Sequence, residues 1–404
     1  MEKTLAILIL GSFVLMVGCG RETELKTGPT FKDDVDFLQR HTDVVLLKDA
    51  SSEAQVVVIP AWQGRVMTST NSGLDGPSFG WINRELIASG TIQEHINAYG
   101  GEDRFWMGPE GGQYSIFFKQ EDPFDLDHWQ TPACIDTDAW ETKSASQSST
   151  SFSENVSLVN YSGTNFDFRI DRTVRLLGET DVHTLLGSAK PSAVEVVAFA
   201  SDNSITNVGT EAWDKETGLL SIWILGMYLP SPTTTIVIPF QQGTREELGQ
   251  IVNDTYFGKV PSDRLQVKGS AVYFKADGEY RSKIGFSPYR ATSVAGSYDS
   301  SQNLLTIVQY DKPEGVVDYV NSMWEIQEEP YAGDVVNSYN DGPPEPGAEA
   351  MGPFYELETS SPAAELGAGE TISHVHRTYH FTGPREQIDQ IARKVLRVGL
   401  DEIP

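Results

Sequence analysis

Short apolar runs alternate with polar, glycine-rich breaks along most of the chain, a pattern typical of β-strands joined by turns. Gly, Asn, Asp and Pro gather in the breaks, as in the stretches 340–343 and 367–369. The segments that have the alternation, or the β-branched and aromatic content, of strands are 55–59, 114–119, 155–161, 166–177, 194–200, 219–225, 233–238, 304–310, 354–359 and 371–381.

Only two segments predict helices, residues 244–252 and 385–398. In the second, Ile388, Ile391 and Val395 recur at helical spacing after Pro384. Many strands, few helices and no long linker predict one all-β domain. The absence of a fixed repeat length favours a large two-sheet β-sandwich, with a jelly roll or a propeller as the alternatives.

The N-terminal segment has the features of an export signal. Residues 5–17 form an apolar run behind Lys3, shorter than the roughly 20 residues of a membrane-spanning helix and typical of a signal peptide. Small residues before Cys19 are similar to the lipobox of bacterial lipoproteins, in which the cysteine is acylated. We expect a lipoprotein signal peptide over 1–18, a flexible tether over 19–35 and a β-sandwich domain over 36–404. A secretory signal with an incidental cysteine is the alternative.

Such a protein would be exported and lipid-anchored in the bacterial cell envelope, in the periplasm or at the cell surface. The chain has 2 Cys. With Cys19 acylated, only Cys134 remains, which excludes an intramolecular disulfide and a cysteine-based zinc site. The formal net charge of -27 excludes a nucleic-acid partner, because phosphate binding needs clustered Lys and Arg. Neutral glycans or cations fit better, although an acidic surface also serves solubility alone.

Two polar clusters precede residue 214. In the first, residues 80–113, glycines let backbone approach a ligand, arginines donate to hydroxyl or carboxylate groups, and aromatic faces stack on a sugar ring. A glycine-rich turn with its tryptophan in the core is the alternative. The second cluster, residues 203–213, has ordinary turn chemistry. The candidate ligand-binding residues of the first cluster are Asn83, Arg84, Tyr99, Arg104, Trp106 and Glu110.

A third polar cluster spans residues 333–362 and adds Asn340 and Asp341 as candidate ligand contacts. Glu356 and Glu358 are two apart on a predicted strand, so they share one face. Neighbouring carboxylates can divide acid and base roles, or hold a cation such as calcium. Downstream, His374 and His376 repeat this spacing and could join a carboxylate around a divalent metal. Such a pair more often lies on a hydrogen-bonded sheet face, so we assign no metal site or cofactor.

The order of several motifs is similar to that of galactose mutarotases (aldose 1-epimerases). These motifs are Asn83-Arg84, Asn97-x-x-Gly100-Gly101 with Trp106, Asn203-x-x-Thr206-Asn207-x-Gly209 and Leu357-Glu358-Thr359. Residues 339–343 and 354–362 resemble, more specifically, an uncharacterised family of bacterial lipoproteins in the galactose-mutarotase-like superfamily. The resemblance covers most of residues 40–385. It implies a β-supersandwich with a sugar cleft, a sugar contact at Arg84 and a general base at Glu358.

Two departures from the mutarotase pattern change the expected chemistry. The histidine before the glycine pair is replaced by Tyr99, and residues 213–227 contain no histidine. Mutarotation needs an acid as well as a base. Here the donor would have to be Glu356 or one of His95, Tyr99, His374 and His376. The sequence therefore favours an envelope lipoprotein that binds or modifies a saccharide over a strict aldose 1-epimerase. Epimerisation, lyase chemistry and glycoside cleavage stay open, and a non-catalytic glycan-binding or structural lipoprotein is the alternative.

Overall fold

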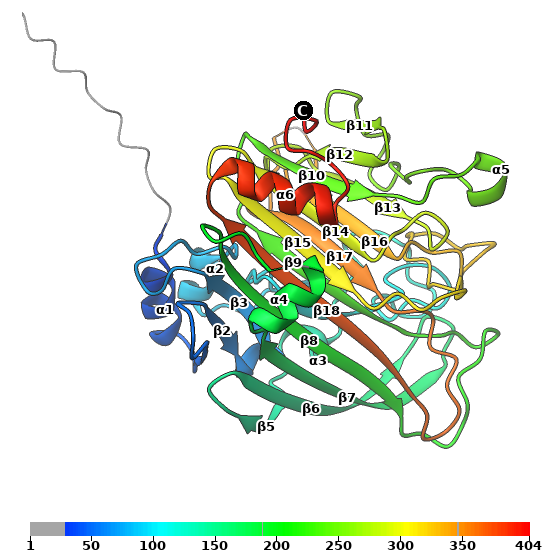
Figure 1. The fold of residues 1–404 in the computed structure, drawn as a ribbon. Helices are drawn as coiled ribbons and strands as arrows, with labels where there is room; N and C mark the ends of the chain where they lie inside the picture. Colours follow the sequence, from blue (N-terminus) through cyan, green and yellow to red (C-terminus); the bar gives the residue numbers. More distant parts are fainter. Residues whose placement is uncertain (1–28, 188, 346) are drawn as a thin grey trace, which may run out of the picture.

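The computed structural model describes residues 29–404, apart from 188 and 346. The expected signal peptide, Cys19 and the first part of the expected tether lie outside the described residues. The described chain is mostly β, and all strand pairs within its sheets are antiparallel. Figure 1 shows two large sheets, with short helices at the edges and a smaller N-terminal sheet beside them.

The larger sheet has 10 strands. In spatial order they are β11 (Leu265–Lys268), β12 (Ala271–Lys275), β10 (Thr234–Pro239), β14 (Val294–Asp299), β15 (Leu304–Tyr310), β18 (Thr371–Thr382), β8 (Glu195–Asn207), β7 (Asn165–Leu176), β6 (Ser149–Val159) and β5 (Glu141–Ala145). The second sheet has 5 strands, in the order β13 (Ser282–Phe286), β16 (Val336–Asn340), β17 (Tyr355–Ser360), β9 (Ser221–Tyr228) and β4 (Arg104–Gly108).

The main core lies between these two sheets. Apolar side chains of β4 and β9, such as Phe105 and Ile224, pack with Phe168 and Phe199 from β7 and β8. A second cluster joins Leu357 of β17 to strands β10, β12 and β15. The all-β fold with large antiparallel sheets and a short C-terminal helix is therefore confirmed.

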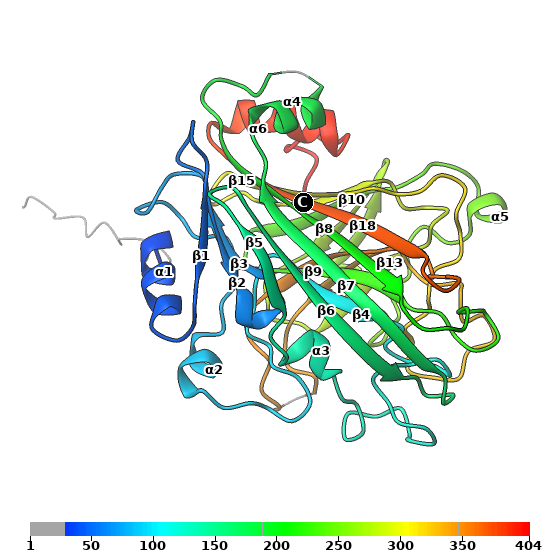
Figure 2. The same ribbon diagram turned by 90° about the horizontal axis from the view of Figure 1, so that it is seen from below.

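Two helices cover the outer face of the larger sheet. They are α4 (Glu179–Leu186) and α6 (Arg385–Val395), and they lie side by side in Figures 1 and 2. Helix α6 buries Ile388 and Ile391 against Leu305 and Tyr379 of the sheet, the apolar stripe that the helical spacing predicts. Apart from helix α1 (Phe31–Gln39), the remaining helical segments are short: η1 (Pro60–Trp62), α2 (Arg84–Ser89), α3 (Ala133–Asp136) and α5 (Arg245–Leu248).

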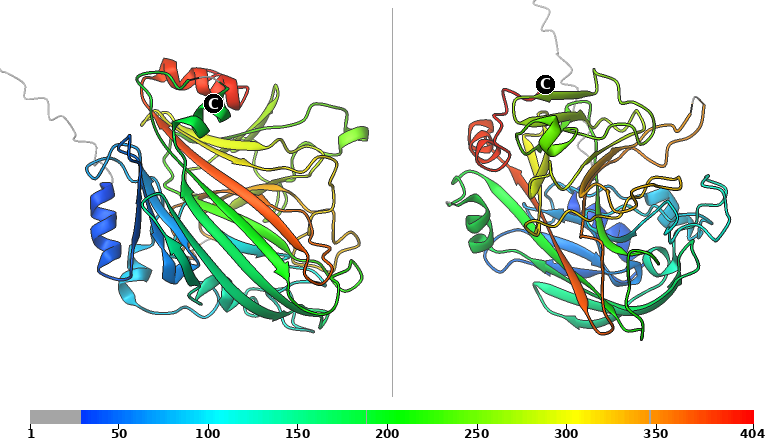
Figure 3. Two further views of the ribbon diagram at one scale, coloured as in Figure 1. Left: turned by 60° about the horizontal axis from the view of Figure 1, so that its bottom comes forward. Right: turned by 90° about the vertical axis from the view of Figure 1, so that its right-hand side faces the viewer.

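The folded domain begins at an earlier residue than the sequence predicts. Helix α1 (Phe31–Gln39) begins at a capping box formed by Thr30 and Asp33, and it buries Phe31 and Val35. It packs beside a three-stranded sheet of β1 (Val45–Lys48), β2 (Gln55–Ile59) and β3 (Arg65–Thr70), drawn in blue in Figure 3. The expected tether over 19–35 was therefore wrong for residues 31–35, because buried apolar side chains hold them in place.

One expected strand is also wrong. Residues 114–119 form turns and bends rather than a strand, although Phe117 and Phe118 are buried in the main core. Their apolar content therefore reflects burial in a loop. Cys134 is a buried free thiol. Within residues 29–187, 189–345 and 347–404, no helix is long and apolar enough to cross a bilayer.

Candidate functional site

The five-stranded sheet turns one face toward the larger sheet and its other face toward a cavity. Successive side chains of a strand point to opposite faces. On β17, Leu357 therefore packs in the core, whereas Glu356 and Ser360 line the cavity. The register pairs Glu356 with Met227 of β9 and with Tyr339 of β16, so cavity-facing residues of three strands form one row.

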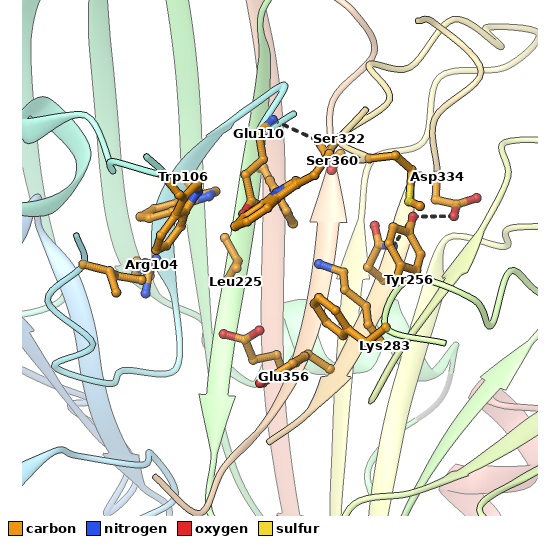
Figure 4. A pocket seen from close by; sticks show the side chains of 18 of the residues that line it. Arg104, Trp106, Glu110, Leu225, Tyr256, Lys283, Ser322, Asp334, Glu356 and Ser360 are labelled. Carbon is orange, nitrogen blue, oxygen red and sulfur yellow. Dashed lines mark hydrogen bonds between the residues drawn. The ribbon is translucent and has the colours of Figure 1, made fainter. Parts of the chain in front are cut away.

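The cavity has a volume of about 450 Å³, within the usual range for small-molecule sites. Its lining combines aromatic rings with ionisable groups, many of which Figure 4 shows pointing toward one another. The aromatic lining residues are Trp106, Trp129, Trp223, Tyr256, Phe257, Trp324, Tyr339 and Phe354. The ionisable lining residues are Arg104, Glu110, Arg281, Lys283, Glu325, Asp334 and Glu356.

Glu356 is the carboxyl group at the floor of the cavity. Burial raises its pKa to about 8, and the nearby Glu358 carboxylate adds to the rise. No hydrogen bond from another described side chain fixes its carboxyl group. Glu356 therefore carries a proton near neutral pH and is free to donate it to a ligand.

Glu358 shares the cavity-side face of β17 but is fully buried and does not line the cavity. Its Oε2 atom accepts hydrogen bonds from Lys283 Nζ and from Trp223 Nε1, each at 3.0 Å. Both donors do line the cavity. Burial lowers the pKa of Lys283, but the carboxyl groups of Glu358 and Glu110 outweigh it and hold the pKa above its usual value. Glu358 thus fixes a charged ammonium group in the cavity wall.

Glu110 follows strand β4 and enters the cavity from the side opposite Glu356 in Figure 4. Its backbone N–H donates to Ser322 Oγ at 3.1 Å, and its Oε1 accepts from Trp324 Nε1 at 3.3 Å. Burial raises the pKa of this carboxyl group. Glu110 and Glu356 are therefore two cavity-facing carboxyl groups whose proton affinity is increased, as acid–base catalysis near neutral pH requires.

Asp334 is a further carboxyl group in the cavity wall, and it lies next to Tyr256. The Tyr256 hydroxyl donates to Asp334 Oδ2 at 2.6 Å, and Asn253 Nδ2 donates to the same oxygen at 3.2 Å. These hydrogen bonds lower the pKa of Asp334, but burial raises it by more, so the pKa lies above its usual value. Gly285 makes room for it, since a Cβ atom at this position would lie 2.1 Å from Asp334 Oδ2.

The histidines that the sequence offered as acids lie elsewhere. His374 Nε2 and His376 Nδ1 are each hydrogen bonded to Thr359 Oγ1 at 2.8 Å, on the core side of β17. Burial lowers the pKa of His374 to about 3 and that of His376 to about 4. Both rings are therefore neutral near pH 7, and neither lines the cavity.

Three residues of the first polar cluster are also outside the cavity lining. Asn83 caps helix α2, because its Oδ1 accepts from the backbone N–H of Leu86 at 3.0 Å. Arg84 forms an ion pair with Asp34, and Tyr99 stacks on Trp62 with ring centroids 4.4 Å apart. Arg104, Trp106 and Glu110 from the same cluster do line the cavity.

Asn340 and Asp341 are buried behind the cavity wall. Asn340 Nδ2 donates to the backbone oxygen of Tyr280 at 2.9 Å. Asp341 Oδ1 accepts from the Tyr339 hydroxyl at 2.8 Å, and its other oxygen accepts from the backbone N–H of Gly352 at 2.9 Å. Since Tyr339 lines the cavity, Asp341 positions a wall residue.

Comparison with protein families gives one match over the whole described body. A model described as a family of unknown function (DUF6786) matches residues 29–404. The chain belongs to the DUF6786 family. No curated protein matches it.

Several solved structures are similar to the DUF6786 chain at low sequence identity. The Slr1438 protein from Synechocystis sp. PCC 6803 has 13% identity and a TM-score of 0.48, covering 85% of this chain and 96% of its own. A galactose mutarotase-like protein from Lactobacillus casei ATCC 334 has 10% identity and a TM-score of 0.46, covering 84% and 100%. A galactose mutarotase related enzyme from Lactobacillus acidophilus has 9% identity and a TM-score of 0.45, covering 85% and 97%.

Sequence reasoning did not select several residues that complete the cavity. They come from four separate parts of the chain, and a single sequence carries no signal that brings them together: Trp223, Tyr256, Lys283, Trp324 and Asp334. In the part of the chain that the structure describes, no three His, Cys, Asp or Glu side chains gather as metal ligands.

Proposed function

We propose that this protein binds a saccharide in the cavity on the five-stranded sheet and acts on it by acid–base chemistry. The observation that carries the proposal is the presence of both Glu110, which is partly buried, and Glu356, which is buried, as carboxyl groups with raised pKa values inside an aromatic-lined cavity. Sugar rings present apolar faces to aromatic side chains and hydroxyl groups to carboxyl, amide and cationic groups.

The two carboxyl groups would have different roles. Glu356, protonated near neutral pH, is the proton donor to a ring or leaving-group oxygen. Glu110 is the second group and accepts a proton from a hydroxyl or from water. Lys283, held by Glu358, supplies a fixed positive charge beside them. Glu358, expected to be the base, is instead a positioning residue in this proposal, because its carboxylate is covered.

A thermal-shift screen of the purified protein against monosaccharides, uronic acids and oligosaccharides tests the binding part. A ligand at 100 times its Kd stabilises a protein by about 2.7 kcal/mol, which corresponds to about 3 °C for a body of this size. No shift across a broad panel would contradict saccharide binding in this cavity.

The Glu356→Gln variant then tests the chemistry. Retained binding with lost turnover supports acid–base catalysis, because glutamine keeps the size of the side chain but has no proton to transfer. If neither the variant nor the wild type turns over any bound saccharide, the protein is a non-catalytic glycan-binding protein.

We also propose that residues 1–18 direct export and that Cys19 is acylated, which would anchor the protein in the cell envelope. The support is the apolar run followed by small residues and a cysteine. Metabolic labelling with a fatty-acid analogue should modify the wild type and spare a Cys19→Ser variant. Equal labelling of both proteins would contradict the anchor.

A further inference from the structure

Arg104 carries a buried positive charge with no partner in the described part of the protein. It begins strand β4, lines the cavity and is only 3% exposed. Its guanidinium lies 3.9 Å from the centre of the Trp106 ring. No described residue forms a hydrogen bond or an ion pair with its side chain, and its Nε is a buried atom without a partner. The guanidinium beside Trp106 is visible at the cavity edge in Figure 4.

The other buried arginines of the described chain are all held by protein groups. Arg172 forms an ion pair with Asp103 at 2.6 Å and donates to Asn203 Oδ1 at 2.7 Å. Arg290 donates to four backbone oxygens, and Arg65 donates to the backbone oxygen of Gly100. A buried charge is costly unless it is paired. Arg104 therefore departs from the pattern, and it does so in the wall of a cavity where a ligand could supply the missing acceptor.

Three cationic side chains line the cavity among its carboxyl groups. Arg104, Arg281 and Lys283 line it, and only Lys283 has an ion-pair partner among the described residues. Four carboxyl groups line the same cavity, namely Glu110, Glu325, Asp334 and Glu356. Arg104 and Arg281 are thus the two cationic lining groups that no described residue pairs, and of these only Arg104 is buried.

We infer that the ligand is an acidic saccharide, and that Arg104 binds its carboxylate. The guanidinium presents a planar fork of N–H donors that matches the two oxygens of a carboxylate. Trp106 lies against the guanidinium face and leaves its N–H edge for the ligand. The inference rests on the proposed function and adds the substrate class, saccharides that contain uronic acid.

Calorimetric titration of the purified protein tests the inference with matched ligands. Glucuronate is compared with glucose, galacturonate with galactose, and an oligogalacturonate with a neutral oligosaccharide of equal length. We expect at least one acidic ligand to bind about tenfold or more tightly than its neutral match. A sugar sulfate is the third arm, and a preference for sulfate over carboxylate would overturn the assignment.

Variants then assign the preference to Arg104. Arg104→Met should remove most of the preference for the acidic ligand, and Arg104→Lys should restore only part of it, because lysine keeps the charge but not the fork. Arg245→Met is the control, since this exposed residue of α5 changes the net charge equally. Loss of the preference in the control as well would show a general charge effect and overturn the role of Arg104.

Folding of the variants is followed by thermal melting. Arg104→Met removes an unpartnered buried charge, so it should melt at or above the wild-type temperature; if it fails to fold, Arg104→Lys carries the test. Neutral sugars that bind as tightly as acidic ones would overturn this inference and leave the proposed function standing. Binding of neither class would overturn both.

Discussion

Replacing Glu356 by Gln should remove a pH dependence from the stability of the folded protein. The carboxyl group has a pKa of 4.5 as its ordinary value and about 8 in the folded state. The folded state therefore holds this proton more tightly than the unfolded chain does. Below about pH 4.5 both states are protonated and the side chain costs nothing; as pH rises toward about 8, ionisation of the unfolded chain reduces the free energy of unfolding. Above that pH the loss is complete.

The size of the effect follows from the two pKa values. Each pH unit between them corresponds to about 1.4 kcal/mol, so the full loss is on the order of 5 kcal/mol. For a body of about 370 residues, with an unfolding entropy of about 2.1 cal/mol/K per residue, this amounts to about 6 °C in Tm. Glutamine cannot ionise and should not show this loss.

The assay is thermal and urea unfolding of the wild type and Glu356→Gln from about pH 5 to about pH 8.5. The Tm of the variant minus the Tm of the wild type should increase by several degrees as pH rises. Glu85→Gln makes the same chemical change on the exposed side of helix α2 and should run parallel to the wild type. Parallel curves for Glu356→Gln as well would refute a protonated Glu356 near neutral pH.

Three other substitutions test the surroundings of the cavity. Lys283→Met leaves the buried Glu358 carboxylate without its cation and should cost about 3–5 kcal/mol in urea unfolding; the double variant with Glu358→Gln should recover much of this, and no recovery would argue against the pair. Gly285→Ala should displace the Asp334 carboxyl group and weaken ligand binding in calorimetry, and unchanged affinity would place Asp334 outside the site. Thr359→Val removes the hydrogen-bond partner of both core histidines and should lower the free energy of unfolding by about 1–3 kcal/mol without changing ligand affinity. A large change in ligand affinity would indicate that the histidines contribute to the site.

Three of the five strands in the cavity sheet were not predicted from the sequence, and neither were β1, β3, β5, β11, β12 and β14 outside it. Strands β4, β13 and β16 were not expected, whereas β2 and β15 were predicted to the residue. Core strands such as β15 are apolar on consecutive positions. Strands β4 and β16 direct Arg104, Asn337 and Tyr339 to the cavity, and these polar side chains hide the apolar alternation on which the prediction depends.

The candidate site was predicted in part, since Arg104, Trp106 and Glu110 of the first polar cluster and Glu356 of the third line the cavity. The period of two placed Glu356 and Glu358 on one face, as the structure has them. It could not decide which carboxyl group reaches the cavity, because the partners of Glu358 lie 75 and 135 residues away in the chain. The same period predicted that His374 and His376 share one face of a strand, but it did not indicate that this face is directed at Thr359 in the core.

The most direct test of the central claim is ¹H NMR of the anomeric signals of a saccharide that stabilises the protein in the thermal-shift screen. We predict that the wild type changes these signals catalytically, and that Glu356→Gln binds the saccharide with unchanged stoichiometry but leaves its spectrum unaltered. Equal turnover by the wild type and Glu356→Gln would contradict acid–base chemistry at this carboxyl group.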